Sequence, residues 1–142
     1  MTPIQDKNSI RGKKARGAGA RFELKVRGDL EKDGWVVSKW VNNVDLEQKK
    51  IVPAKRKYNP FMRALSVGTG FPDFVCIRRK KKGKLYKVIG VEVKSLGYLK
   101  PEEKKKCEVL LELGIFSKML IARKGKENGK IDYEDFENKY LK

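Results

Sequence analysis

Residues 70–77 read GFPDFVCI, and residues 91–94, beyond a basic turn, read VEVK. Each stretch is an apolar run interrupted by charge: Asp73 stands near the start of the first, and Glu92 and Lys94 stand two residues apart in the second. Runs rich in β-branched and aromatic residues predict β-strands. Successive side chains of a strand point to opposite faces of the sheet. We therefore expect Glu92 and Lys94 to share one face, while the two valines beside them pack on the other.

The basic turn, KKKGK at residues 80–84, favours a hairpin between these two strands. Pairing of the strands would bring Asp73 close to Glu92, so that two carboxylates and one ammonium converge at a sheet edge. Carboxylate oxygens suit a hard cation, and a cation with a positive group beside it promotes the attack of water on a phosphodiester. The pattern is therefore typical of metal-assisted phosphodiester hydrolysis.

Glu-x-Lys pairs also have an ordinary explanation as solvated surface charges. The Glu92 pair differs because it interrupts an apolar strand, where unpaired charges would be costly to bury. The residues alone thus leave two interpretations, a catalytic site and a structural ion pair. The same spacing recurs outside strand sequence in Glu23-Leu24-Lys25, Glu47-Gln48-Lys49, Glu102-Glu103-Lys104 and Glu137-Asn138-Lys139.

The composition predicts one domain with a polyanionic partner. The chain has 142 residues, enough for one hydrophobic core, and its 35 Lys and Arg against 18 Asp and Glu give a formal net charge of +17. Nucleic acid is the partner we expect, because neutralising phosphates releases condensed counterions and so drives binding. A membrane is not expected, since the sequence has neither a long apolar span nor the apolar core of a signal peptide.

Histidine is absent from the chain. Its absence excludes Ser-His and Cys-His catalysis, His-ligated zinc and a histidine general base, so any hydrolytic chemistry must rest on carboxylates, lysine and metal. Cys76 and Cys107 lie in apolar segments without Cys-x-x-Cys spacing, and we expect them to be reduced core residues of a cytoplasmic protein.

The hydrophobic pattern predicts an α/β domain. Residues 1–16 are expected to be a mobile basic arm and residues 17–142 a single domain, with a long basic loop at 42–69 that contains a short helix near 61–65. The order of elements favours a mixed central β-sheet with helices on both faces. The expected helices span 17–33, 101–113 and 132–141, and the expected strands span 35–41, 72–79, 85–94 and 116–122.

Together, Pro72-Asp73 and Glu92-Val93-Lys94 resemble the signature of the PD-(D/E)XK nuclease superfamily. The segment 19–24, GARFEL, resembles the first helix of the archaeal Holliday-junction-resolvase branch, in which a glutamate follows a small-residue turn. The resemblance covers most of residues 17–123. It implies a restriction-endonuclease-like fold, a mixed central sheet flanked by helices in the order α-β-β-β-α-β-α. It also implies a Mg²⁺-dependent endodeoxyribonuclease of DNA repair or recombination.

The resemblance also implies a role for each residue of the signature. Asp73 and Glu92 would ligate Mg²⁺ or Mn²⁺, with the carbonyl of Val93 completing the protein ligands. Lys94 would orient or activate the attacking water and stabilise charge on the phosphate. Glu23 would be a further ligand, direct or through water; its alternative is an exposed helix acid.

This sequence departs from the family pattern at two places, residue 103 and the loop at 42–69. Related families often present a glutamine from the helix after the Glu-x-Lys strand, whereas this chain has Glu103, for which an ordinary first-turn acid is the expectation. Thr69 or Ser66 is the candidate for the hydroxyl that positions the phosphate in resolvases. The loop at 42–69 is much longer than the short connection in resolvases, and it could clamp DNA or block a four-way junction.

We expect a double-stranded or branched DNA partner, held through its phosphates rather than read by its bases. An RNA substrate stays open. A resolvase would need to be a homodimer to cut two strands symmetrically, and the expected location is the cytoplasm, on the nucleoid. The residues expected to contact nucleic acid are Arg11, Lys13, Lys14, Arg16, Arg21, Lys55, Arg56, Lys57, Thr69 and Lys104.

The sequence therefore predicts a metal-dependent DNA endonuclease, either structure-selective like the Holliday-junction resolvases or a general repair nuclease. The alternative is a non-catalytic nucleic-acid-binding protein in which Asp73, Glu92 and Lys94 form a structural ion pair. A requirement for a divalent cation separates the two.

Overall fold

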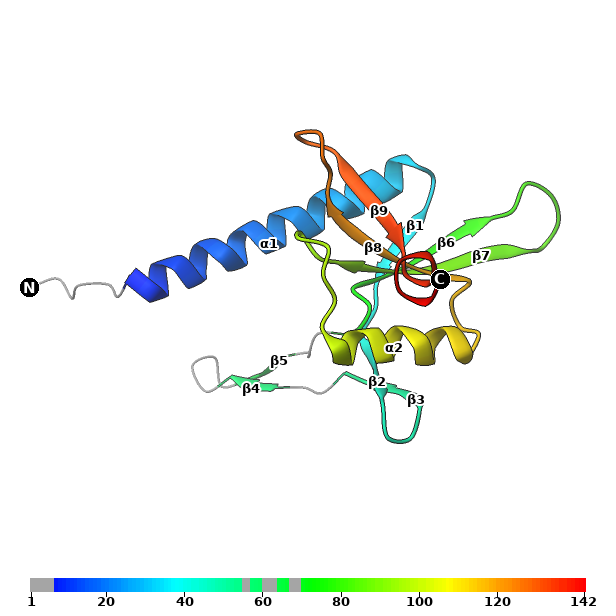
Figure 1. The fold of residues 1–142 in the computed structure, drawn as a ribbon, viewed down its shortest axis with the longest axis horizontal. Coiled ribbons are helices and arrows are strands. Elements are labelled where there is room, and N and C mark those ends of the chain that lie inside the picture. Colours follow the sequence, from blue (N-terminus) through cyan, green and yellow to red (C-terminus); the bar gives the residue numbers. More distant parts are fainter. Residues whose placement is uncertain (1–6, 55–56, 60–63, 67–69) are drawn as a thin grey trace, which may run out of the picture.

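The computed structural model describes residues 7–54, 57–59, 64–66 and 70–142. At its centre is a five-stranded sheet with strand order β1-β6-β7-β8-β9 (Figure 1). Within this sheet β7 and β8 run parallel and the other neighbours run antiparallel, which confirms the predicted mixed α/β sheet. The strands span Val36–Lys39 (β1), Phe74–Arg79 (β6), Tyr86–Val93 (β7), Lys118–Lys124 (β8) and Ile131–Asp135 (β9).

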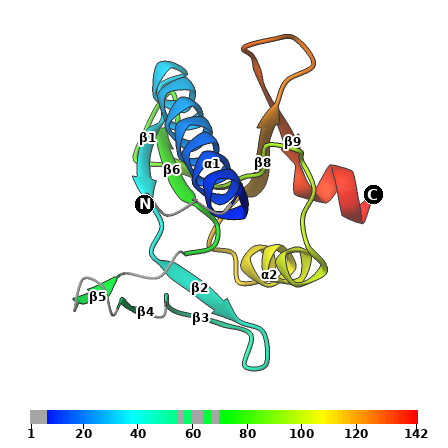
Figure 2. The same cartoon turned by 90° about the vertical axis from the view of Figure 1, so that its left-hand side faces the viewer.

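One long helix covers each face of the sheet (Figure 2). α1 (Lys7–Lys32) packs on one face through Phe22, Val26 and Leu30, the i, i+4, i+8 series visible in the sequence. α2 (Pro101–Glu112) forms the crossover between the parallel strands β7 and β8 and packs on the other face. Each helix covers its own hydrophobic cluster, so the two faces of the sheet are closed separately.

The hairpin that the sequence predicts between β6 and β7 is present. Phe74 lies opposite Val91, and the turn closes where the N–H of Lys80 donates to the carbonyl of Leu85 at 3.0 Å. Val91 is fully buried on the α1 side. Because side chains alternate along β7, Glu92 points to the opposite face, which is the α2 side, and the predicted separation of Glu92 from Val91 is confirmed.

α1 begins earlier than the sequence predicts. Its helical backbone starts at Lys7 rather than near residue 17, so residues 7–16 extend the helix instead of forming a separate arm. Residues 1–6 lie outside the described part. The first half of the helix projects beyond the sheet (Figure 1). Periodicity does not predict this half because it carries no apolar series.

The segment expected as one long loop contains two small antiparallel hairpins. The short helix expected near 61–65 is wrong at residues 64–65, which belong to a strand, while residues 61–63 lie outside the described part. Val44, in the first hairpin, is buried in the cluster under α2, which attaches this hairpin to the body. The hairpins pair Asn42–Asp45 (β2) with Lys50–Pro53 (β3), and Lys57–Asn59 (β4) with Ala64–Ser66 (β5).

The C-terminal helix expected over residues 132–141 is only partly present. Its first half is β9, an edge strand antiparallel to β8, and a π-helix, η1 (Glu137–Leu141), follows. As a strand, β9 forms hydrogen bonds with the backbone N–H and C=O groups along the free edge of β8. It also lets the hydroxyl of Tyr133 donate to Oδ2 of Asp29 in α1 at 2.7 Å.

Cys76 and Cys107 are buried and unbridged, as expected for core thiols. Burial raises the pKa of Cys76 to about 12 and that of Cys107 even higher. Among the described residues, no helix has the length and apolar character needed to span a bilayer.

Candidate active site

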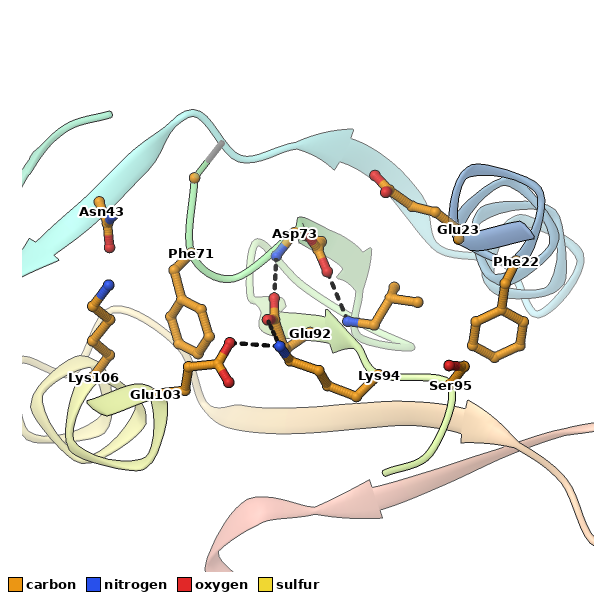
Figure 3. Close-up of a pocket in the computed structure, with 13 residues that line it drawn as sticks. Phe22, Glu23, Asn43, Phe71, Asp73, Glu92, Lys94, Ser95, Glu103 and Lys106 are labelled. Carbon is orange, nitrogen blue, oxygen red and sulfur yellow. Dashed lines mark hydrogen bonds and ion pairs between the residues drawn. The ribbon is translucent and has the colours of Figure 1, made fainter. Parts of the chain in front are cut away.

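Asp73 and Glu92 are held together by two backbone hydrogen bonds. The N–H of Asp73 donates to Oε1 of Glu92 at 3.1 Å, and the N–H of Val93 donates to Oδ2 of Asp73 at 2.8 Å (Figure 3). Asp73 directly precedes β6, and the other two residues end β7. The paired strands therefore fix both carboxylates at one end of the hairpin, where the sequence places them.

Glu92 is a carboxyl group in an almost closed setting, with 5% of the residue exposed. Burial, and after it the negative charge of Asp73, raise the pKa of Glu92 from 4.5 to about 10, while Lys94 acts in the opposite direction. In the absence of a metal, Glu92 therefore carries a proton at neutral pH. Two carboxyl groups this close and this shielded from water need a proton or a cation between them.

Lys94 lies between two acids. Its Nζ is 2.7 Å from Oε2 of Glu103 and 3.7 Å from Oε2 of Glu92. Burial acts to lower the pKa of Lys94, but the hydrogen bond to Glu103 and the nearby carboxylates outweigh it, so this pKa lies above its ordinary value. Burial likewise acts to raise the pKa of Glu103, and the bond to Lys94 outweighs that effect and lowers it. Lys94 is thus a stable ammonium held by a stable carboxylate.

The start of α2 positions Glu103. Pro101 suits the first helical position, and the N–H of Lys100 donates to Oε1 of Glu103 at 2.8 Å, the reciprocal bond of a capping box. One oxygen of Glu103 therefore caps the helix while the other meets Lys94. The ordinary first-turn acid that the sequence indicates is also a member of the site.

These groups open into a pocket of about 490 Å³ at the end of the sheet. Three of its polar residues, Asn43, Ser95 and Lys106, are not among the residues that the sequence predicts for the active site. Lys106 follows Glu103 by one helical turn, and this spacing is a signal that could have identified it. The remaining lining comes from Gly19, Phe22 and Glu23 of α1, from Gly70 and Phe71, and from Val93.

Glu23 lines the same pocket but stands apart from the Asp73–Glu92 pair. Its Oε1 lies 3.4 Å from Nζ of Lys39 in β1, and Figure 3 shows it pointing into the pocket from α1, across from Glu92. Of the two ligand roles implied for Glu23, this position fits contact through water better than direct ligation.

The donor set fits a hard divalent cation. Asp73 and Glu92 offer carboxylate oxygens and Val93 offers a backbone carbonyl, the ligand types that Mg²⁺ and Mn²⁺ prefer. A cation would also offset the repulsion that raises the pKa of Glu92 beside Asp73. Among the described residues, no group of three or more acidic or cysteine side chains surrounds one point. Further ligands would therefore be water and substrate, as is usual for Mg²⁺.

The residues expected to contact nucleic acid are only partly described. Lys14 and Arg21 are exposed on α1, and Nζ of Lys104 lies 4.5 Å over the ring of Tyr140. The others lie outside the residues or side chains that the structure describes: Arg11, Lys13, Arg16, Lys55, Arg56, Lys57 and Thr69.

Comparison with known proteins gives no relative: no family model, no curated protein and no solved structure matches the chain.

Proposed function

We propose that the protein is a Mg²⁺- or Mn²⁺-dependent DNA endonuclease of the PD-(D/E)XK type, with one active site per chain. One observation carries the proposal. The buried carboxyl of Glu92 accepts from the backbone N–H of Asp73, and the carboxylate of Asp73 accepts from the backbone N–H of Val93, with the ammonium of Lys94 beside both acids. An acid this deeply buried costs folding free energy, and a function that needs it explains why the cost is tolerated.

The residues of the site would have different roles in the reaction, according to their charge and position. Asp73, Glu92 and the carbonyl of Val93 would hold the cation. When bound, the cation supplies charge neutralisation at the scissile phosphate and promotes ionisation of water. Lys94 would stabilise the negative charge that develops on the phosphate, because its pairing with Glu103 keeps it protonated and fixed in place.

The order of the elements supports the restriction-endonuclease-like assignment. A helix, a strand, the Pro-Asp strand, the Glu-x-Lys strand, a crossover helix and a parallel strand follow one another as α1, β1, β6, β7, α2 and β8. The hairpins β2–β3 and β4–β5 are inserted between the first two strands of this series. Asn43 of β2 lines the pocket, which makes the β2–β3 hairpin a candidate for contacts to the substrate.

The net charge of +17 favours DNA as the substrate, double-stranded or branched. Contacts to phosphates would make cutting structure-selective rather than sequence-specific. A junction resolvase would act as a homodimer that cuts two strands, and a repair nuclease would act on single lesions. Either would work on chromosomal DNA at the nucleoid.

A cleavage assay tests the proposal. Wild-type protein should nick supercoiled plasmid and cut a four-way junction with Mg²⁺ or Mn²⁺, and should do neither in EDTA. Asp73→Asn and Lys94→Ala should each lose on the order of a hundredfold or more in rate. The matched controls are Glu112→Gln and Lys118→Ala, exposed residues toward the far ends of α2 and β8, which should cleave like wild type.

A second candidate function is a non-catalytic nucleic-acid-binding protein. The observation in its favour is the close pairing of Lys94 with Glu103 at 2.7 Å, which ties α2 to the end of β7 without any metal. This function predicts DNA binding that is indifferent to divalent cations, with no cleavage under any condition. Equal activity of wild type, Asp73→Asn and Lys94→Ala would favour it over the nuclease.

A further inference from the structure

α1 presents two adjoining stripes to two different pockets. The second pocket has a volume of about 390 Å³ and lies between α1 and the turn that joins β8 to β9. Phe22 lines both pockets, so the two pockets share this residue as part of their walls. The stripes are Gly19, Phe22 and Glu23 on the active-site pocket, and Ala18, Arg21, Phe22 and Lys25 on the second pocket.

The turn on the other side of the second pocket is internally braced. The N–H of Gly125 donates to the carbonyl of Lys130 at 2.8 Å, and the N–H of Lys126 donates to Oδ2 of Asp132 at 3.3 Å. Gly129 takes a left-handed φ of 83° that the tight turn requires. The wall of the pocket is therefore formed before any ligand arrives.

The second pocket is strongly cationic. Arg21 and Lys25 enter it from α1, and Lys124 and Lys130 enter it from the turn. Its acid, Glu127, lies 2.7 Å from Lys130 and offsets that lysine. The other three cations take part in none of the ion pairs between described residues. The pocket therefore carries surplus positive charge.

The candidate active site has the opposite balance. Four carboxylic acids line it against two lysines. A phosphodiester backbone that enters this pocket meets repulsion, which a bound cation offsets only at the reacting phosphate. An adjoining pocket with fixed positive charge would hold the same backbone beside the acids.

We propose that the second pocket binds a backbone phosphate of the DNA, next to the phosphodiester that faces Asp73 and Glu92. This assignment rests on the proposed nuclease function. Lys25 and Lys124 hold the phosphate from opposite walls, and Arg21 adds a planar donor group suited to phosphate oxygens. The strand crosses the edge of Phe22 between the two pockets. The enzyme therefore needs a DNA strand that continues past the scissile phosphodiester on at least one side. It should cleave poorly a DNA strand that ends at that phosphodiester.

The test compares two double variants of equal charge. Lys25→Gln with Lys124→Gln removes two cations from the pocket, and Lys32→Gln with Lys118→Gln removes two exposed cations elsewhere. Binding of a short fluorescein-labelled duplex is measured by anisotropy in EDTA over a range of salt concentrations. A third variant, Lys25→Arg with Lys124→Arg, keeps the charge, and thermal unfolding of all variants verifies folding.

The pocket variant should bind DNA weaker by on the order of tenfold at about 0.1 M salt, since the pocket holds one phosphate and each neutralised phosphate contributes roughly 0.9 to the slope of log K against log salt. Its salt slope should fall by about 1. The control variant should lose only a few-fold, and the arginine variant should bind nearly as wild type.

Equal losses in the pocket and control variants would overturn the proposal, because total charge alone would then explain binding. Cleavage by the same proteins with Mg²⁺ separates the two proposals. If wild type cleaves DNA and the pocket and control variants lose equal binding, the phosphate site is rejected and the proposed nuclease function stands. Selective loss of binding without any cleavage by wild type rejects the nuclease and keeps the phosphate site.

Discussion

Replacing Glu92 by glutamine should stabilise the metal-free protein while abolishing its proposed activity. Burial and the charge of Asp73 raise the pKa of Glu92 from 4.5 to about 10. Between those two values the native carboxyl keeps a proton that the unfolded chain has released. The contribution of Glu92 to the free energy of unfolding therefore falls as the pH rises from about 4.5 to about 10. Glutamine has nearly the shape of the protonated acid, and it has no proton to lose.

The size of the stability change follows from the interval between the unfolded and native pKa values of Glu92, 4.5 and about 10. One proton difference changes the free energy of unfolding by about 1.4 kcal/mol per pH unit. The contribution of Glu92 to stability is fully present below the unfolded pKa of 4.5, and on the order of 3 kcal/mol of it is lost by about pH 7. Glu92→Gln removes this loss. Lys94 keeps its closer partner, Glu103, at 2.7 Å, so the substitution leaves the ammonium paired.

Urea unfolding in EDTA, from about pH 5 to about pH 9, measures the effect. The wild type should lose stability relative to Glu92→Gln as the pH rises, and the variant should be more stable at neutral pH. Glu112→Gln, which removes an exposed carboxylate of the same helix that carries Glu103, should follow the wild type. A Glu92→Gln variant that is no more stable than wild type, with the same pH slope, would refute the reasoning.

Three further predictions concern the candidate active site and the fold that supports it. Glu103→Gln should keep the helix cap but lose the ion pair with Lys94, so it should reduce stability by about 1–3 kcal/mol and slow cleavage. Glu102→Gln, at an exposed position, should neither reduce stability to that extent nor slow cleavage. Urea unfolding and plasmid nicking measure the two effects. Mg²⁺ in about hundredfold excess over its dissociation constant should stabilise wild type, but not Asp73→Asn, by about 2.7 kcal/mol in thermal unfolding; equal shifts in both would contradict the assignment of the ligand. Gly70→Ala should destabilise, because its methyl would overlap backbone carbonyls at the start of the inserted segment, whereas Gly28→Ala on open helix surface should stabilise by roughly 0.5–1 kcal/mol in calorimetry.

The central hairpin could be predicted because its signals are local. The local composition of residues 72–79, 80–84 and 85–94 predicts a strand, a turn and a strand, and the turn sets which residues of the two strands pair. The approach of Asp73 to Glu92 follows from that register alone. α2 is equally local, with Pro101 at its start and a glycine at its end.

The segment at 131–141 shows where local signals end. Tyr133, Phe136 and Tyr140 fit a helical spacing, and nothing nearby in the chain contradicts it. The strand β9 forms because β8 has an open edge, which is a property of the assembled sheet and not of the segment. The two small hairpins in 42–66 are hidden for a related reason, since strands of three or four residues carry little periodicity.

The composition of the site was predicted in part. Asp73, Glu92 and Lys94 could be placed because strand alternation fixes their faces. The contact of Lys94 with Glu103 could not, because it depends on how α2 packs against the end of β7. The charge contrast between the two pockets along α1 likewise depends on which elements lie beside each stripe of the helix.

Single-turnover cleavage with the protein in excess over labelled DNA tests the central claim most directly, because it separates chemistry from binding. At protein concentrations that bind all of the substrate, wild type should cleave it when Mg²⁺ or Mn²⁺ is added, and Asp73→Asn should hold the same DNA while cleaving on the order of a thousandfold more slowly. Cleavage by Asp73→Asn at the wild-type rate, or fully bound DNA that wild type leaves intact with either metal, would contradict the claim that Asp73, Glu92 and Lys94 form a nuclease site.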